Sequence, residues 1–339
     1  MFTLTKDHIE YVKQVCKTAA TRHANQAFEC VLIECDSTRN EVKLTGGDGI
    51  VEIVRVLSAD VETDFSTAVN AVKFMQSVDA CKSPTGILKD QLIVKHGRRQ
   101  FKIQTVSAEA YPAYPKSVDD HKIDGVTPSN LIDTIKAVSF AAAKNDVRHM
   151  LNGVFIGGHA VATNGHRMCV IDLGLSKNAI VSIEAVNKIP LDISGTVFLS
   201  DNVMSIIDES YEFKCKLIDG KYIGYERAIP QSSVNNVSVE RADFIDAIKA
   251  AQINAPDSGN VIFHFCDEST IRSRSGRNED AKIGFDCETS ADFEMSFNSS
   301  YLIDALKVIK SESVELLFTD SQMYFREGGI LNVISMCRI

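Results

Sequence analysis

The sequence predicts an α+β fold of six similar units, in which amphipathic helices pack on antiparallel sheets. One pattern, with two apolar residues, an acidic residue, any residue, an apolar residue and a lysine, occurs at Leu131–Lys136, Phe244–Lys249 and Leu302–Lys307. Looser copies lie at Ala68–Lys73 and His8–Lys13. The lysines at 13, 73, 136, 249 and 307 are separated by 60, 63, 113 and 58 residues. The gap of 113 leaves room for one more copy, and such a period indicates a repeat architecture.

Each copy is expected to form one helix. Its apolar residues recur at helical spacing and make one stripe for burial, as at Leu131, Ile132, Ile135 and Val138. Residues that often cap helix N-termini stand near three starts, at Ser129, Asp243 and Ser299. The sixth helix is expected around the apolar stretch Val203–Ile207, which carries no lysine.

Strand-like runs separate the helices, and many alternate apolar and polar residues as in a sheet with one covered face. They are Phe28–Cys35, Val51–Val56, Gln91–Lys95, Gln100–Val106, Val154–Ile156, Met168–Leu173, Glu212–Leu217, Val261–Phe265, Val314–Phe318 and Leu331–Met336. The glycine-rich segments Gly46–Gly49 and Gly157–His159 are expected to be hairpin turns, because neither has the spacing of a dinucleotide or phosphate-binding loop.

Length and composition predict several domains. The chain has 339 residues, of which 45% are apolar, enough for two or three cores. Pairing the six units predicts domains at residues 1–122, 123–238 and 239–339, with linkers at Pro115–Thr127 and Gln231–Glu240. Nine cysteines without a CxxC pair, and an N-terminus without an apolar leader, predict a reduced, cytoplasmic protein. No run approaches the roughly 20 apolar residues that span a membrane.

Charge and motifs bear on function. A net charge of −9 does not by itself favour nucleic-acid binding. The lysines can still line one surface if all the repeat helices face one way. The alternative is that each lysine forms a local pair with the acidic residue three positions earlier. His149, His159 and His166 lack metal-site spacing, and no nucleophile elbow, HExxH or supported acid pair occurs. No catalytic residue, metal or cofactor is therefore expected.

The segment Arg148–Gly153, RHMLNG, followed by Ala162–Met168, ATNGHRM, resembles the RxxLNG and ATDGHRL segments of the bacterial DNA polymerase III beta subunit, the β sliding clamp. Asp219–Pro230, DGKYIGYERAIP, resembles the family's DGRFPDYxRVLP segment. Gly97–Phe101, followed by Tyr111 and Pro112, resembles its SGRSRF…FP segment. The similarity is collinear over essentially the whole chain.

The resemblance implies three clamp domains of the DNA clamp fold, each with two helices on antiparallel sheets, which form half of a ring. A head-to-tail homodimer would encircle double-stranded DNA and tether the replicative DNA polymerase, with no chemistry of its own. The diameter of a helix, roughly 10 Å, agrees with a ring made of two chains. Six helices side by side in a circle enclose an opening about 9 Å wide, whereas the twelve helices of two chains leave about 28 Å for a duplex. The alternatives are a repeat-built cytoplasmic scaffold that never closes and, third, an enzyme.

The expected DNA-facing residues come from two sources. The repeat pattern contributes the lysines Lys13, Lys73, Lys136, Lys249 and Lys307. The resemblance contributes Arg22, Asn145, Arg148 and His149. The family's basic pair at the start of the sixth helix falls on Ser200 and Asp201, which accounts for the missing lysine.

The family's partner cleft lies between its second and third domains and accepts a short extended peptide with apolar residues, from the polymerase or the clamp loader. The resemblance places it on Leu151, Thr163, Gly165, His166, Arg167, Met168, Ile223, Arg227, Ala228, Val333, Ile334, Ser335, Met336 and Cys337. Three positions depart from the family pattern: Asn164 stands for aspartate, Ile223 for proline and Ala228 for valine. The C-terminal tail departs as well. If the chain were a single domain, Leu151, Met168 and Ile334 would be ordinary core residues.

Overall fold

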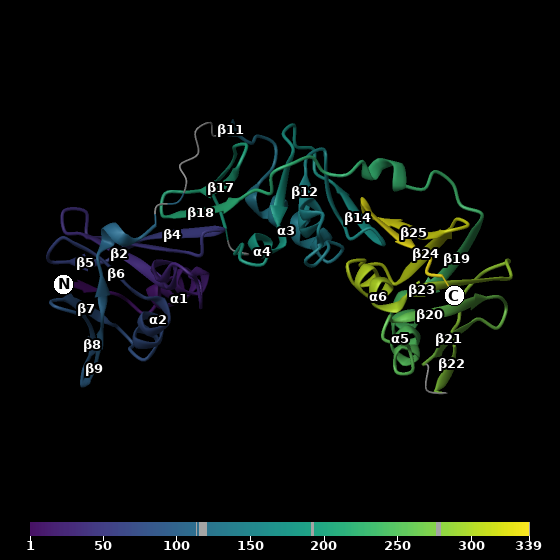
Figure 1. The fold of residues 1–339 in the computed structure, drawn as a ribbon, viewed down its shortest axis with the longest axis horizontal. Helices are drawn as coiled ribbons and strands as arrows, with labels where there is room; N and C mark the ends of the chain where they lie inside the picture. Colours follow the sequence, from purple (N-terminus) through teal and green to yellow (C-terminus); the bar gives the residue numbers. More distant parts are fainter. Residues whose placement is uncertain (113, 115–120, 191–192, 276–278, 339) are drawn as a thin grey trace. The chain divides into compact units, whose positions relative to one another are not determined.

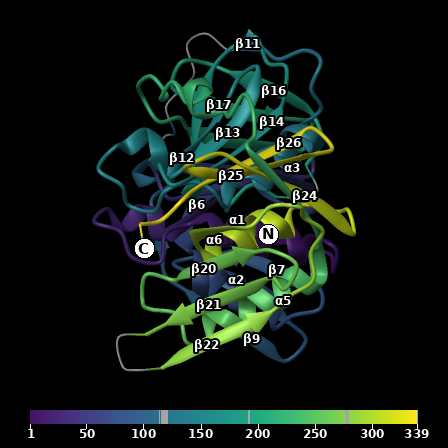
Figure 2. The ribbon, with the colours of Figure 1, turned by 90° about the vertical axis from the view of Figure 1, so that its right-hand side faces the viewer.

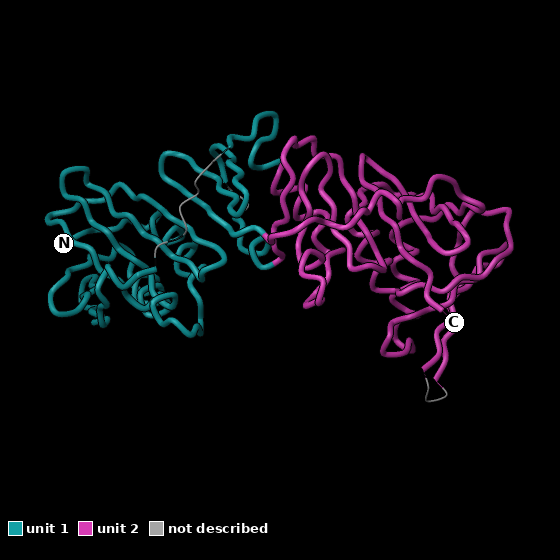
Figure 3. Tube along the Cα trace, turned by 45° about the horizontal axis from the view of Figure 1, so that its top comes forward, with its two compact units in different colours: residues 1–130, 184–217 teal, residues 131–183, 218–339 magenta. Residues whose placement is uncertain are grey.

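The structure, a computed structural model, describes residues 1–112, 114, 121–190, 193–275 and 279–338 (Figure 1). The chain divides into two compact units, which Figure 3 colours separately. Unit 1 contains residues 1–130 and 184–217, and unit 2 contains residues 131–183 and 218–339. Among the described residues, no helix is both long and apolar enough to cross a membrane.

Unit 1 contains two antiparallel sheets. The five-stranded sheet has the order β5 (Asp60–Val61), β1 (Phe2–Thr3), β7 (Thr85–Leu88), β8 (Leu92–His96) and β9 (Arg99–Ile103). The nine-stranded sheet has the order β10 (Thr105–Val106), β6 (Phe65–Asn70), β2 (Cys30–Asp36), β3 (Glu41–Gly47), β4 (Val51–Ser58), β18 (Tyr211–Lys216), β17 (Val203–Ile207), β16 (Thr196–Leu199) and β11 (His121–Lys122). Helices α1 (His8–Thr18) and α2 (Ala71–Asp79) lie side by side against these sheets.

Helix α1 follows from its sequence pattern. Ile9, Val12, Val15 and Cys16 recur at helical spacing and are buried. The helix crosses β3 at Gly46, where a Cβ atom would lie 2.3 Å from the carbonyl oxygen of Val15. Only glycine allows this close approach of helix and strand.

The pairing of β4 with β18 joins segments far apart in the sequence within unit 1, and it buries a carboxylate. Glu52 of β4 lies opposite Lys214 of β18 and is 8% exposed. Lys214 Nζ lies 3.9 Å from Glu52 Oε1 but only 2.8 Å from Glu212 Oε1. Burial therefore dominates over the attraction of Lys214 and raises the pKa of Glu52 from 4.5 to about 7.

We expect Glu52→Gln to stabilise the protein at pH 8 and to have little effect near pH 4.5. Folding favours the protonated carboxyl because the folded pKa is raised, so the native chain loses stability as pH rises from about 4.5 to 7. A pKa shift of this size corresponds to a change in the free energy of unfolding on the order of 3 kcal/mol. Urea denaturation of both proteins between pH 4.5 and 8 measures it.

Glu34→Gln is the control, because Glu34 on β2 is a partly exposed carboxylate paired with Lys43. Removing such a surface pair changes the free energy of unfolding by roughly 0–1 kcal/mol, which is smaller than the change expected at Glu52. A Glu52→Gln difference that is the same at pH 4.5 and pH 8 would contradict the burial argument.

Unit 2 also contains two antiparallel sheets. The eight-stranded sheet has the order β15 (Ala179–Ser182), β12 (Gly153–Ile156), β13 (His159–Thr163), β14 (Arg167–Asp172), β26 (Ile330–Ser335), β25 (Gln322–Glu327), β24 (Ser313–Phe318) and β19 (Asn235–Glu240). The four-stranded sheet has the order β22 (Asp280–Gly284), β21 (Thr270–Arg274), β20 (Asn260–Phe265) and β23 (Phe293–Asn298). Helices α5 (Arg241–Gln252) and α6 (Ser299–Lys307) contact each other beside it (Figure 2). Helix α3 (Pro128–Ser139) begins in unit 1 and continues into unit 2.

The α+β class of the prediction is confirmed, and each of the ten predicted runs contains a strand. Both glycine-rich segments form hairpin turns, between β3 and β4 and between β12 and β13. The predicted linker Gln231–Glu240 is wrong in its second half, because Asn235–Glu240 is strand β19 and pairs with β24. Residues 115–120 of the other linker lie outside the described residues.

The expected sixth helix at Val203–Ile207 is wrong. This segment is strand β17, which pairs with β16 and β18, and its first four residues are buried. A short apolar run buried on both faces has the composition of a helix segment or of a central strand, so periodicity could not distinguish them. The helix of this repeat is α4 (Ile183–Val186), and it is followed by Lys188.

The predicted caps were also misplaced, by one to three residues. Thr127 Oγ1 accepts a hydrogen bond from the backbone N–H of Asn130 at 3.2 Å, and Asn298 Oδ1 accepts one from Tyr301 at 3.1 Å. Ser129, Asp243 and Ser299 lie in the first turns of α3, α5 and α6. Serine and aspartate are also common in a first turn, so composition alone does not locate the cap.

Candidate peptide-binding cleft and DNA-facing surface

The repeated lysines do not all occupy one helical position. Lys136, Lys249 and Lys307 are each the ninth residue of their helix. Lys13 is the sixth residue of α1, and Lys73 is the third residue of α2. The copy at Ala68–Lys73 spans the junction between β6 and α2, so the expectation of one equivalent helical segment is wrong there.

Lys13 and Lys249 each form an ion pair with the local carboxylate of the alternative interpretation. Lys13 Nζ lies 2.9 Å from Glu10 Oε1 and 2.6 Å from Asp79 Oδ1, and Lys249 Nζ lies 2.9 Å from Asp246 Oδ1. Burial lowers the pKa of Lys136, against the opposing effect of Asp133. Lys73 and Lys307 are exposed, and no described carboxylate lies within ion-pair distance of them. These two are the lysines most open to phosphate.

Arg22 lies beside a basic hollow of about 830 Å³ in unit 1. The cationic and imidazole side chains on its wall are Lys17, Arg22, His23, Lys188 and Lys216, and the acidic ones are Asp48 and Glu184. Lys188 forms an ion pair with Asp48. The rings of Phe28 and His23 pack edge to face, with their centroids 4.7 Å apart. The sequence analysis missed Lys188 because it assigned the sixth helix to the wrong segment. Ser200 and Asp201 flank β17, so they do not begin a helix.

Asn145, Arg148 and His149 share one exposed turn in unit 2. Asn145 has a positive φ of 58°, which asparagine tolerates better than most residues. Asp146 holds Arg148 through two contacts, Nε to Oδ1 at 3.0 Å and Nη2 to Oδ2 at 2.9 Å. These bonds lower the pKa of Asp146 to about 2. Arg148 is therefore positioned at the surface but partly neutralised.

The predicted cleft residues Leu151, Met168 and Val333 lie together in one apolar cluster of unit 2. Tyr222 and Tyr225 belong to the same cluster and anchor the loop that carries Ile223, Arg227 and Ala228. Phe155 stacks on Tyr222 with ring centroids 5.3 Å apart, and His159 Nδ1 lies 2.9 Å from the Tyr225 hydroxyl. Ile223, Arg227 and Ala228 are exposed at the rim of the cluster. Neither tyrosine is among the predicted site residues, although their spacing of three residues matches one face of a turn.

The sheet separates the predicted residues onto two faces. Met168 pairs with Val333 and Arg167 with Ile334, and neighbouring residues of a strand point to opposite faces. Ile334 belongs to the other apolar core of unit 2, with α5 and α6. Arg167 Nη1 lies 2.8 Å from Asp304 Oδ2 of α6, and its guanidinium stacks over Tyr301 at 4.5 Å. Arg167 therefore attaches β14 to α6 and does not share the face of Met168.

The segment Thr163–His166 forms the turn between β13 and β14. Thr163 Oγ1 donates to the Arg167 carbonyl at 2.7 Å and accepts from the Gly165 N–H at 3.0 Å. Asn164 Oδ1 accepts from the N–H groups of His166 and Arg167 at 2.9 and 3.0 Å. An amide oxygen thus provides the acceptor that the family's aspartate would provide. The turn exposes His166, and Gly165 has the positive φ of 88° that glycine accommodates.

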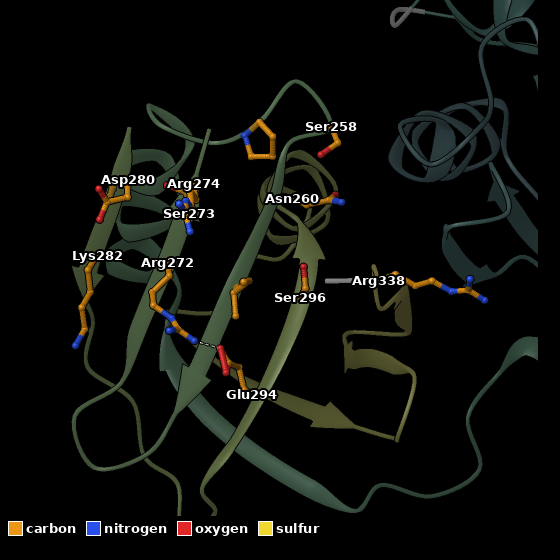
Figure 4. A pocket seen from close by; sticks show the side chains of 13 residues that line it. Ser258, Asn260, Arg272, Ser273, Arg274, Asp280, Lys282, Glu294, Ser296 and Arg338 are labelled. Carbon is orange, nitrogen blue, oxygen red and sulfur yellow. Dashed lines mark hydrogen bonds and ion pairs between the residues drawn. The ribbon is translucent and has the colours of Figure 1, made fainter. Parts of the chain in front are cut away.

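The C-terminal residues diverge from the cluster after Ser335. The Ser335 N–H donates to the His166 carbonyl at 2.8 Å, but those of Met336 and Cys337 donate to Ser321 and Ser296. Arg338 then lines a groove of about 690 Å³ over the four-stranded sheet. Figure 4 shows this groove, with the ion pair between Arg272 and Glu294 dashed. Met336 and Cys337 therefore lie beside β23 and the turn before β25.

A hollow of about 340 Å³ continues the cluster along the same strands. Val170 and Leu331 belong to both, each two residues along its strand from the paired Met168 and Val333. Its remaining wall is His159, Asp172, Ile229 and Arg326–Ile330. The arrangement offers apolar side chains beside the backbone of the turn between β25 and β26, which suits a peptide with apolar side chains.

Comparison with known families identifies what this arrangement belongs to. Three models of the DNA polymerase III beta subunit match the chain in order, the N-terminal domain over residues 1–115, the central domain over 125–223 and the C-terminal domain over 226–326. The chain belongs to the DNA polymerase III beta subunit family, the sliding clamps. The family is a processivity factor and not a catalytic enzyme, so the resemblance and the non-enzymatic prediction are confirmed.

Individual sliding clamps agree with this membership. The chain is 29% identical to the beta sliding clamp of Pseudomonas aeruginosa over 308 residues, 83% of each chain. It is 26% identical to that of Escherichia coli K12 over an alignment of 352 positions, covering 94% of this chain and 93% of that one. The crystal structures of the Pseudomonas aeruginosa and Bacillus subtilis clamps have TM-scores of 0.90 and 0.89 at 24% and 22% identity. Each comparison covers 100% of this chain and 99% of the solved one, which shows that the fold is the clamp fold.

The sliding-clamp assignment leaves the roles of individual residues as predictions. In the described part of the chain, no group of three or more histidine, cysteine, aspartate or glutamate side chains is arranged to hold a metal ion.

Proposed function

We propose that this chain is a sliding clamp that encircles duplex DNA as a head-to-tail homodimeric ring and tethers the replicative DNA polymerase. Membership of the sliding-clamp family supports the general role. The observation that carries the ring is a pair of open sheet edges, one in each compact unit.

Among the described strands, β9 and β22 are the two long sheet edges that no other backbone segment meets, although the Asn254 side chain donates to the Asp280 carbonyl at one end of β22. Each has five residues and ends its sheet. The remaining edge strands are shorter or covered. Strands β5, β10 and β11 have two residues each and β15 has four, while β19 is met by Glu288 and β23 by Cys337. An exposed edge invites pairing with another chain. If β9 of one copy pairs with β22 of a second, two-fold symmetry repeats the contact and the ring closes.

Charge supports this pairing. The segment around β9 carries three cations and no carboxylate: Arg98, Arg99 and Lys102. The segment around β22 carries three carboxylates and one cation: Glu279, Asp280, Asp286 and Lys282. Opposite charges across an interface favour the correct partner and accelerate association.

The cluster of Leu151, Met168 and Val333, with the rim of Ile223 and Ala228, is the proposed site for polymerase and clamp-loader peptides. Apolar anchors of an extended peptide would cover this rim. Each contributes roughly 1.5–3 kcal/mol when fully buried. Two or three anchors supply roughly 3–9 kcal/mol before the cost of ordering the peptide, so the peptide is expected to bind weakly, with a binding free energy no stronger than about −8 kcal/mol, the micromolar limit.

The proposed DNA surface combines the repeat lysines with the hollow beside Arg22 and the turn at Arg148. A net charge of −9 argues against tight phosphate binding. A closed ring does not need it, because weak contacts that permit sliding suffice when topology prevents dissociation.

Light scattering tests the dimer. The parent protein is expected at twice 37.3 kDa, whereas Arg98→Glu/Lys102→Glu is expected to be monomeric in the micromolar range, because it places negative charge on β9 opposite an acidic edge. Lys89→Glu/Lys95→Glu makes the same change of charge beside and on β8, inside the sheet, and should leave the dimer intact. A parent protein that is monomeric at these concentrations would instead favour the scaffold that never closes.

A further inference from the structure

Cys266 is one of three half-buried cysteines in unit 2, and its thiol contacts a histidine that in turn contacts an aspartate. Its Sγ lies 3.9 Å from Nδ1 of His264, the residue two positions earlier in β20. Nε2 of the same ring lies 2.8 Å from Oδ1 of Asp292, just before β23. The three groups therefore form a chain from carboxylate to imidazole to thiol.

This order fixes what each atom can do. The Asp292 carboxylate only accepts hydrogen bonds, so Nε2 of His264 carries the hydrogen and Nδ1 presents its lone pair to the thiol. The imidazole can take the thiol proton, and the carboxylate then stabilises the imidazolium. The thiolate, rather than the thiol, is the nucleophilic form of cysteine.

Ser269 holds Cys266 in place. Its Oγ accepts a hydrogen bond from the Cys266 N–H at 3.0 Å and donates one to the Cys266 carbonyl at 2.8 Å. Ser269 is 4% exposed, so these bonds are shielded from water. The backbone that carries the thiol is thus fixed relative to the β20 strand that carries His264.

The other cysteines lack this arrangement. Cys287 contacts Ser269 Oγ at 3.1 Å, and burial raises its pKa. Burial also raises the pKa of Cys337. The remaining six cysteines are buried, and among the described residues Cys266 is the one cysteine whose sulfur contacts a histidine ring.

We propose that Cys266 is a nucleophilic thiol that small hydroperoxides oxidise to a sulfenic acid. The thiolate sulfur attacks one peroxide oxygen, an S–O bond forms and the O–O bond breaks. The departing oxygen takes the proton held by His264 and leaves as water or an alcohol. The sulfur loses two electrons and the peroxide gains them, so the step balances with the hydroperoxide as oxidant.

Mass mapping of the full chain after limiting hydrogen peroxide at pH 7, with dimedone to trap sulfenic acid, tests this. We expect the adduct at Cys266 to form about tenfold faster or more than at Cys287 or Cys337, because a free thiol is only a few per cent thiolate at pH 7 and a positioned base raises that fraction. The Cys266→Ser variant should lack this adduct, which identifies Cys266 as the modified residue. Equal rates at the three half-buried cysteines would overturn the proposal.

Two substitutions separate the histidine effect from simple exposure. His264→Gln should reduce the Cys266 rate to that of Cys337, and Asp292→Asn should reduce it part of the way. Both side chains are well exposed, at 40% and 79%, so both variants are expected to fold, and circular dichroism checks this. Asp257→Asn makes the same change of charge at an exposed carboxylate of unit 2 outside this cluster and should leave the rate unchanged. If His264→Gln reacts as fast as the parent, the imidazole has no role and the proposal fails.

Discussion

Once a clamp loader has placed the protein on nicked circular duplex DNA, we expect it to stay there while the circle is intact and to leave when the DNA is cut. A closed ring can dissociate only by opening or by sliding off an end. Raising the salt screens phosphate contacts and should release any protein held by charge alone. Gel filtration of labelled protein with the DNA, before and after a single cut, measures the difference.

Two controls isolate topology from affinity. Linear DNA with a bulky protein bound at each end should retain the clamp like the circle does. The Arg98→Glu/Lys102→Glu variant should be lost from both forms, since its β9 edge is expected not to pair. If the parent protein leaves circular and linear DNA at the same rate, it does not encircle DNA.

The double variant Ile223→Glu/Ala228→Glu should bind a polymerase-derived peptide at least about a hundredfold more weakly, a loss near 3 kcal/mol. The change removes apolar contact with the peptide and would bury unpaired carboxylates beneath it. Ile223 is 37% exposed and Ala228 is also exposed, so the fold should tolerate both changes. Calorimetry with an extended peptide that carries leucine and phenylalanine gives the dissociation constants.

Val234→Glu is the matched control for peptide binding. Val234 is an apolar residue of unit 2 that is 64% exposed and lies outside the Asp219–Pro230 loop. The Val234→Glu variant should bind the peptide as tightly as the parent does. Light scattering should find the parent and both variants dimeric. Unchanged binding by Ile223→Glu/Ala228→Glu would place the cleft elsewhere and leave the ring proposal untouched. Met168 is a poorer target, because a charge on its buried side chain would also destabilise the cluster.

The sequence predicted the repeat helices that have a complete apolar stripe, because periodicity of 3.6 residues depends only on local order. The prediction failed at α4, because a helix of four residues is too short to display an apolar stripe. Lys188, which follows α4, was missed for the same reason. The prediction also misread Ala68–Lys73, since a strand and a helix together reproduced the pattern by coincidence.

The cleft was predictable only in part for a related reason. The residues Leu151, Met168 and Val333 come from three separate segments, and the family resemblance, rather than any local pattern, grouped them. Arg167 and Met168 are neighbours in β14 and therefore lie on opposite faces of the sheet, and the role of Arg167 in the peptide site stays a prediction. The contact of Arg167 with Asp304 spans 137 residues, and no spacing rule indicates a partner at that distance.

The central family domain does not coincide with one compact unit of the fold. Its residues 131–183 pack with the C-terminal segment through the β14–β26 ladder, and residues 184–217 pack with the N-terminal segment through β4 and β18. Backbone ladders of this kind tend to open together with the strands on either side of them. A chimaera that exchanges the central domain with that of another clamp therefore has to transplant two compatible strand pairings. Recombination between relatives should be tolerated better inside the loops of one unit than at the boundaries that the family models mark.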